Sequence, residues 1–195
     1  MRFEMASSIS HIEIATASKA SVAGSVMNDV NRTKNWYAVT VFPRHERCVA
    51  RLLDVRDTKY LLPLYTSVRR WKDRRKQMEM VLFPGYVFVN IEMERRLDVL
   101  MLPGVARFVT FQGRPVVVPS QEIEAIGVGA CSGVALEPHP YLQKGRRVRV
   151  RSGPMAGVEG ILVRRKDKFR LVLSVDLIMR SVAAEVDEAD IEALT

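Results

Sequence analysis

The chain has 195 residues, of which 48% are hydrophobic; this is enough for two domains with their own cores and excludes a wholly disordered protein. Thirty Lys and Arg against 22 Asp and Glu give a net charge of +8, which favours a polyanionic partner such as nucleic acid. The sequence contains no run of about 18 apolar residues, so no membrane-spanning helix is predicted. It also has no long apolar segment near the N-terminus, so secretion is not predicted. Only Cys48 and Cys131 are present, so a reducing, cytoplasmic location is expected.

The first domain is predicted to be of the α+β class. Residues 1–34 are rich in Ser, Ala and Thr without apolar periodicity, which predicts a disordered tail, and the folded domain is expected over residues 35–128. The predicted elements, in chain order, are a strand at 36–42, an amphipathic helix at 44–55, strands at 60–65 and 86–91, a short helix near 94–101, strands at 105–111 and 116–118, and a helix at 120–126.

The second domain differs from the first in its pattern of polar and apolar residues. Residues 127–141 contain glycines and two prolines without periodicity, which predicts a flexible linker at 129–143. Beyond the linker, residues 147–151 alternate between polar and apolar, and glycines punctuate several short segments that are typical of strands. This pattern predicts a small closed or nearly closed β-barrel over residues 144–195.

Three segments taken together resemble the NusG family of transcription elongation factors. They are Trp36-Tyr37 with Pro43-Arg44-His45-Glu46, Leu82 to Val89 with Pro103-Gly104-Val105, and Lys144-Gly145 through Gly157-Val158-Glu159-Gly160, which is similar to the KOW motif. The resemblance implies an N-terminal antiparallel sheet with flanking helices (NGN-like) and a C-terminal SH3-like β-barrel that contains the KOW motif. The stretch from Leu62 to Lys76 is more similar to the specialised branch that includes UpxY and RfaH.

The resemblance also implies a docking surface for bacterial RNA polymerase. Phe83, Pro84, Tyr86 and Phe88 correspond to positions at which the family binds the clamp helices of the polymerase. In a strand, Tyr86 and Phe88 share one face. That face is either an apolar docking surface, which the resemblance favours, or the core face of the sheet.

Two groups of basic residues are candidates for nucleic-acid binding. The first surrounds Trp71 and consists of Arg69, Arg70, Lys72, Arg74, Arg75 and Lys76. These side chains are predicted to contact upstream or non-template DNA, and the alternative is a solvated hairpin tip. The second group is Arg44, His45 and Arg47 at the start of the first helix, where related factors read non-template bases; ordinary charges on a helix surface are the alternative.

A third candidate site is a loop of the barrel formed by Leu177, Ile178, Met179 and Arg180. The housekeeping members of the family carry Ile-Phe-Gly-Arg there and use it to contact ribosomal and termination partners. Ile178-Met179 replaces Phe-Gly, which argues against the termination factor Rho and leaves the ribosome as the candidate partner. Alternatively, Leu177 and Ile178 cap the barrel core.

No catalytic residue, metal site or cofactor is predicted. His45 and Cys48 have no second ligand pair at zinc spacing, and no phosphate-binding or dinucleotide-binding fingerprint occurs. The sequence therefore predicts a monomeric, non-catalytic elongation and antitermination factor, specific to particular operons. The alternatives are a housekeeping NusG-type factor, or a KOW protein that binds ribosomes or RNA through the basic segment from Lys144 to Arg151.

Overall fold

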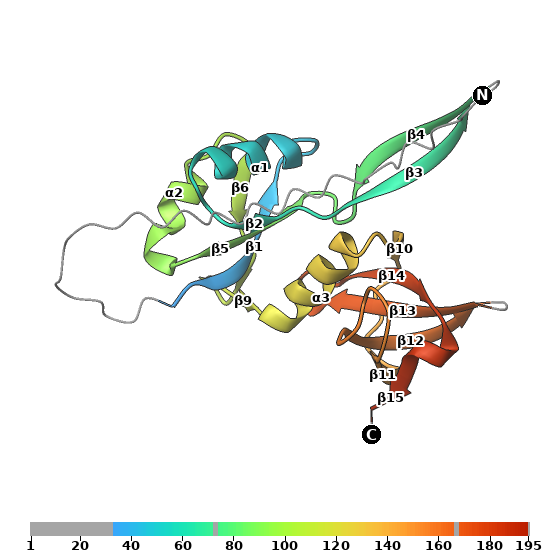
Figure 1. Cartoon of the computed structure of the whole chain (residues 1–195). Helices are drawn as coiled ribbons and strands as arrows, with labels where there is room; N and C mark the ends of the chain where they lie inside the picture. The colour runs from blue at the N-terminus through green and yellow to red at the C-terminus, as the bar shows by residue number, and fades with distance from the viewer. Residues whose placement is uncertain (1–32, 72–73, 166–167, 195) are drawn as a thin grey trace, which may run out of the picture.

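The computed structural model describes residues 33–71, 74–165 and 168–194, with only the backbone described between 68 and 76. The predicted disordered tail at 1–34 falls almost entirely outside the described residues. Among those residues, no helix is both long and apolar enough to cross a membrane. The chain combines helices and antiparallel sheets (Figure 1), and the prediction of an α+β protein is confirmed.

The N-terminal part is an antiparallel sheet centred on β1. Its strands are β1 (Asn35–Val41), β2 (Tyr60–Leu61), β5 (Tyr86–Ile91), β6 (Val105–Phe108) and β9 (Val117–Val118). They follow the order β2-β5-β1-β6, and β9 also pairs with β1. The register places Thr40 opposite Tyr86, so the end of β1 and the start of β5 meet at one end of the sheet.

Side chains alternate between two buried faces of this sheet, as the strand period requires. Val39 of β1 and Val87 of β5 lie in a core with α1 (Glu46–Val55) and α2 (Arg96–Leu100), which follows the short 3-10 turn η1 (Met93–Arg95). On the opposite face, Trp36, Ala38 and Phe88 belong to a core with α3 (Ser120–Cys131). The sheet therefore has helices on both sides.

Two hairpins lie outside this sheet. The longer one, β3 (Leu64–Trp71) with β4 (Arg74–Val81), extends away from the domain (Figure 1). The sequence did not predict its length, because the basic block at 69–76 interrupts the apolar alternation that indicates a strand. The shorter hairpin, β7 (Thr110–Phe111) with β8 (Arg114–Pro115), follows β6.

The C-terminal part is a second antiparallel sheet, which is strongly curled (Figure 1). The strand order is β10-β14-β13-β12-β11-β15. The bounds are β10 (Leu136–His139), β11 (Arg146–Val150), β12 (Glu159–Arg165), β13 (Lys168–Val175), β14 (Arg180–Val186) and β15 (Ile191–Ala193), with 3-10 turns η2 (Asp176–Ile178) and η3 (Glu188–Asp190). Its buried side chains include Val148, Leu171 and Val182.

The structure differs from the prediction of a flexible linker at 129–143. This interval holds the end of α3 and strand β10, which pairs with β14. Ile123, Ile126 and Ala130 of α3 are buried in an apolar cluster that runs from the N-terminal sheet into the C-terminal sheet, because α3 contacts both β1 and β13.

One of the glycines that suggested a linker, Gly129, serves close packing instead. A Cβ atom added at Gly129 would lie 3.3 Å from both Leu136 and Met155, so a glycine here lets α3 approach the C-terminal sheet closely. Glycines in the second half of α3 interrupt the helical spacing of its apolar residues, so the sequence pattern there is weak. The two parts are therefore packed together through α3.

Candidate functional site

The turn from β4 to β5 and the start of β5 contain the four aromatic and proline positions of the predicted docking surface. Phe83 and Phe88 are 1% and 0% exposed, and their rings pack edge to face with centroids 5.7 Å apart. The prediction that these two side chains form an exposed surface is corrected: they are core residues, since α3 and the sheet enclose them. Pro84 is exposed and Tyr86 is half-buried, so these two form the accessible part of the turn.

Glu46 holds this turn in place, and sequence reasoning missed it. Its side chain is buried, and its Oε1 accepts a hydrogen bond of 2.8 Å from the backbone N–H of Gly85. Val41 donates a backbone hydrogen bond of 2.9 Å to the Gly85 carbonyl, and Gly85 has a φ of +83°, which favours glycine. Because Glu46 and Gly85 are 39 residues apart, no local pattern relates them.

Next to this turn, the junction between β1 and α1 carries an exposed aromatic and two basic residues. Phe42 is 54% exposed and packs edge to face on the His45 ring, with centroids 6.2 Å apart. His45 Nδ1 lies 3.1 Å from the Pro43 carbonyl oxygen, and Arg44 adopts a φ of +66°. Arg44 and His45 are exposed, in agreement with a contact surface but also with the alternative of ordinary surface charge.

Arg47 has a different environment from that predicted. Its guanidinium lies 3.1 Å from a carboxylate oxygen of Glu79 in β4. Both side chains are about half exposed, so the ion pair contributes little to stability. The contact instead links α1 to the base of the long hairpin, and the Arg47 charge is shared with a carboxylate.

The basic block lies at the tip of the long hairpin, and its side chains lie outside the described residues. The backbone register pairs Arg69 with Lys76 and Arg70 with Arg75 on adjacent strands. Lys72, like Asp73, falls in the undescribed tip, and Arg74 starts β4. The contact of this block with DNA stays a prediction.

The barrel loop is only partly accessible. Ile178 is buried and Leu177 is half-buried in the apolar cluster that includes α3. The prediction that both side chains are exposed is therefore corrected, and the two residues cap the core, which was the alternative. Met179 is 66% exposed and adopts a left-handed backbone with φ 50° and ψ 49°. Arg180 is also exposed, so Met179 and Arg180 are the accessible part of this loop.

A carboxylate contact joins this loop to α3. Glu122 Oε2 accepts a hydrogen bond of 3.3 Å from the backbone N–H of Asp176, and Asp176 accepts one of 3.0 Å from the Tyr141 hydroxyl. Burial raises the pKa of Glu122; the Asp176 carboxylate raises it further, although the hydrogen bond from the Asp176 backbone opposes both. The contact is therefore sensitive to the charge on Glu122.

The basic strand β11 is less positive than its sequence suggests. Arg149 forms ion pairs with Glu159 and, at 3.9 Å, with Glu192, and Arg147 lies 3.6 Å from Glu159. These carboxylates offset much of the charge that favoured binding to ribosomal RNA.

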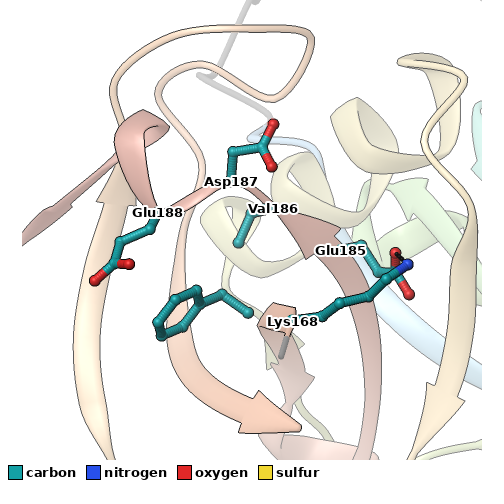
Figure 2. Close-up of a pocket in the computed structure, with 6 residues that line it drawn as sticks. Lys168, Glu185, Val186, Asp187 and Glu188 are labelled. Atoms are coloured by element: carbon teal, nitrogen blue, oxygen red, sulfur yellow. Dashed lines mark hydrogen bonds and ion pairs between the residues drawn. The ribbon is translucent and has the colours of Figure 1, made fainter. Parts of the chain in front are cut away.

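A shallow pocket of about 450 Å³ lies at one end of the C-terminal sheet (Figure 2). Its lining consists of Lys168, Phe169, Glu185, Val186, Asp187 and Glu188. The Lys168 ammonium pairs with Glu185 and lowers the pKa of that carboxyl group. The pocket contains neither a nucleophile beside a base nor a cradle for phosphate, so its geometry supports no reaction. In the described part of the chain, no three His, Cys, Asp or Glu side chains are grouped so as to hold a metal ion.

These features define a protein of two packed parts, an N-terminal α+β part and a curled C-terminal β-sheet, with a braced turn at one end of the first sheet and a projecting hairpin. Residues 34–127 match the family model described as "Transcription termination factor nusG". The "Transcription termination/antitermination protein NusG" of Escherichia coli K12 is 29% identical over 175 residues, covering 82% of this chain and 96% of that protein. The protein of the same name from Helicobacter pylori J99 is 25% identical over 173 residues, covering 82% and 98%.

A solved structure entitled "Domain interaction in Thermotoga maritima NusG" matches 83% of this chain and 98% of its own, with 20% identity and a TM-score of 0.46. Slightly less than half of the chain is thus similar to the NusG family model, and both sequence relatives carry the NusG name. These relatives are transcription factors, so the prediction that the chain is not an enzyme is confirmed.

Proposed function

We propose that this chain is a non-catalytic transcription elongation and antitermination factor that binds the clamp helices of bacterial RNA polymerase in the cytoplasm and suppresses pausing or termination. The observation that carries the proposal is the match to the NusG family model across the N-terminal sheet and its helices, together with relatives named termination/antitermination proteins that align over nearly their whole length.

The docking surface of this proposal is centred on Pro84 and Tyr86. Both are accessible at the end of the sheet, and Glu46 fixes the backbone of the turn that carries them. Phe83 and Phe88 act from beneath as packing residues. A half-exposed aromatic held on a rigid turn is a favourable interface anchor, because little side-chain freedom is lost on binding.

Upstream or non-template DNA is the proposed nucleic-acid partner of the long hairpin. The hairpin extends away from the sheet with its basic residues at the tip, and Arg47 links its base to α1 (Figure 1). Arg44 and His45 lie beside the docking turn and are proposed to face the same DNA.

The C-terminal sheet is proposed to be the family's SH3-like, KOW-containing barrel. Met179 and Arg180 are its proposed contacts with the ribosome, and binding to Rho is not expected, since Phe-Gly of the housekeeping loop is replaced here. Specificity for particular operons is proposed from the segment between Leu62 and Lys76, whose hairpin is the part that resembles specialised relatives. Mapping the protein along the genome tests this point: signal on few operons supports it, and signal on most transcribed genes supports a housekeeping factor.

Binding to an isolated clamp-helix fragment of the polymerase tests the docking surface. The variant Tyr86→Ala is expected to weaken binding by about 2 kcal/mol, roughly thirtyfold in Kd. Phe169→Ala, which removes a half-buried aromatic from the C-terminal sheet, is the matched control and should bind like wild type. Equal binding by wild type and Tyr86→Ala would show that the turn is not the docking site.

Reversal of Arg74, Arg75 and Lys76 to Glu tests the hairpin. It is expected to weaken association with a complete transcription complex and to flatten the salt dependence by about one unit of log–log slope per lost phosphate contact. Binding to the clamp-helix fragment alone should not change. If the salt dependence of binding to the transcription complex does not change, the basic residues of the hairpin are solvated and do not contact DNA.

A further inference from the structure

The short β7–β8 hairpin holds an aromatic side chain in solvent. Its turn consists of Gln112 and Gly113, with φ angles of +50° and +77°, the two positive values that a tight two-residue hairpin requires. The register pairs Phe111 directly with Arg114 across the strands. Phe111 is 68% exposed, so this turn displays the ring on a backbone of fixed geometry.

Two arginines lie close to this ring along the chain. Arg114 is the cross-strand neighbour of Phe111, a position at which Cβ atoms are about 5 Å apart. Arg107 is on β6, which ends at Phe108, and Phe111 is on β7, which begins at Thr110. Val109 between the two strands donates a backbone hydrogen bond of 2.8 Å to the Ala38 carbonyl. Arg107 and Phe111 are four residues apart in the chain, so their Cα atoms are at most about 14 Å apart.

Both guanidinium groups are available for a ligand. Arg107 and Arg114 are exposed, and among the described residues neither has a carboxylate within ion-pair distance. Many other arginines of the chain do: those at 47, 95, 147, 149 and 170 all pair with acidic side chains. The segment 105–115 contains no acidic residue.

We propose that the β7–β8 hairpin is a binding site for single-stranded nucleic acid, in which Phe111 stacks on an unpaired base and Arg107 and Arg114 contact the flanking phosphates. A rigidly displayed aromatic ring suits the exposed face of a base that is free of a duplex, and unpaired arginines suit the backbone on either side. The bases of a duplex are stacked on one another, so a duplex could bind the two arginines through its phosphates but could not stack on Phe111. The β7–β8 hairpin is not part of the docking turn or of the long hairpin, but Arg107 adjoins the docking turn, because Arg107 pairs with Thr40 and Thr40 pairs with Tyr86. The test below therefore uses the chain without polymerase.

The test compares two single-stranded probes of equal length and charge, with the full-length chain. One probe is an oligothymidylate of twelve nucleotides, and the other is a twelve-nucleotide abasic strand. Phe111→Ala should weaken binding to oligothymidylate about tenfold, within the range of stacking on one base, and should not change binding to the abasic strand. Phe111→Trp should restore binding to oligothymidylate, and its fluorescence should be quenched by that probe alone.

Arginine variants and controls complete the test. Arg114→Ala should weaken binding to both probes and reduce the log–log salt slope by about 0.7, the value for one phosphate of a single strand. Val117→Ala, an exposed apolar change in the adjacent strand β9, and Arg165→Ala, an exposed arginine in β12, should bind like wild type. Circular dichroism should show an unchanged fold for Phe111→Ala, since the side chain is exposed.

Three results would overturn the proposal. In the first, Phe111→Ala binds oligothymidylate as tightly as wild type. In the second, it loses the same factor on both probes, which would show that the ring does not stack. In the third, the binding that Phe111→Ala loses is to polyglutamate rather than to oligothymidylate, which would identify the hairpin as a surface for an acidic protein.

Discussion

Replacing Glu46 removes the link between α1 and the docking turn. In Glu46→Ala the backbone N–H of Gly85 loses its 2.8 Å bond to a buried carboxylate. Hydrogen bonds to charged groups contribute about 1.5–3 kcal/mol, and an acidic residue in the first turn of a helix adds about 0.3–1 kcal/mol. Because the Gly85 N–H is only partly buried, a water molecule can replace part of the lost hydrogen bond to Glu46. The free energy of unfolding is therefore expected to fall by about 2 kcal/mol.

Thermal unfolding measures this loss. For a chain of this size, 1 kcal/mol corresponds to about 2–4 °C, so Glu46→Ala should melt about 4–8 °C lower than wild type. Glu46→Gln keeps an acceptor oxygen and should lose less than half as much. Binding to the clamp-helix fragment should fall in the same order, since the turn loosens. If Glu46→Ala melts like wild type, the hydrogen bond to Gly85 does not hold the turn.

Three further substitutions separate core, charge and backbone effects. Phe88→Ala should destabilise the chain by about 3–5 kcal/mol in urea unfolding because it empties a fully buried site; a loss below about 1 kcal/mol would contradict the core assignment. Burial raises the pKa of Glu122 above its ordinary value of 4.5, so folding favours the protonated side chain. The contribution of Glu122 to the free energy of unfolding is therefore fully present below pH 4.5 and is lost as the pH rises through the pKa of the folded state. Glu122→Gln should therefore be more stable than wild type at pH 7 but not near pH 4, and a difference independent of pH would refute the shift. Met179→Gly should raise stability by about 0.5–1 kcal/mol, because glycine adopts the left-handed backbone without strain, and a lower melting temperature would contradict this.

Local patterns predicted most of the N-terminal sheet. The aromatic and β-branched runs at β1 and β5 alternate between two buried faces, and the apolar spacing of α1 places Val49 and Leu53 against the sheet. Alternation could not decide whether the face with Tyr86 and Phe88 was covered, because that depends on α3, which follows more than thirty residues later. The structure covers Phe88 and leaves Tyr86 half exposed.

Contacts between distant residues account for what the sequence missed. The hydrogen bond from Gly85 to Glu46 joins two turns that only the folded sheet brings together. Gly129 suggested flexibility, but its role is close packing against Met155, which is not visible without the second domain. Arg47 and Arg149 counted as free positive charges in the sequence and are paired with Glu79 and Glu159 in the fold.

The duration of a defined transcriptional pause, measured in a purified system with bacterial RNA polymerase, tests the central proposal most directly. At saturating concentration, the wild-type chain is expected to shorten the pause, and Tyr86→Ala is expected to restore the duration seen without the factor. Phe169→Ala should shorten the pause as wild type does. A pause that is unchanged or prolonged by the wild-type chain, although the chain is bound to the polymerase, would contradict the account of an antitermination factor.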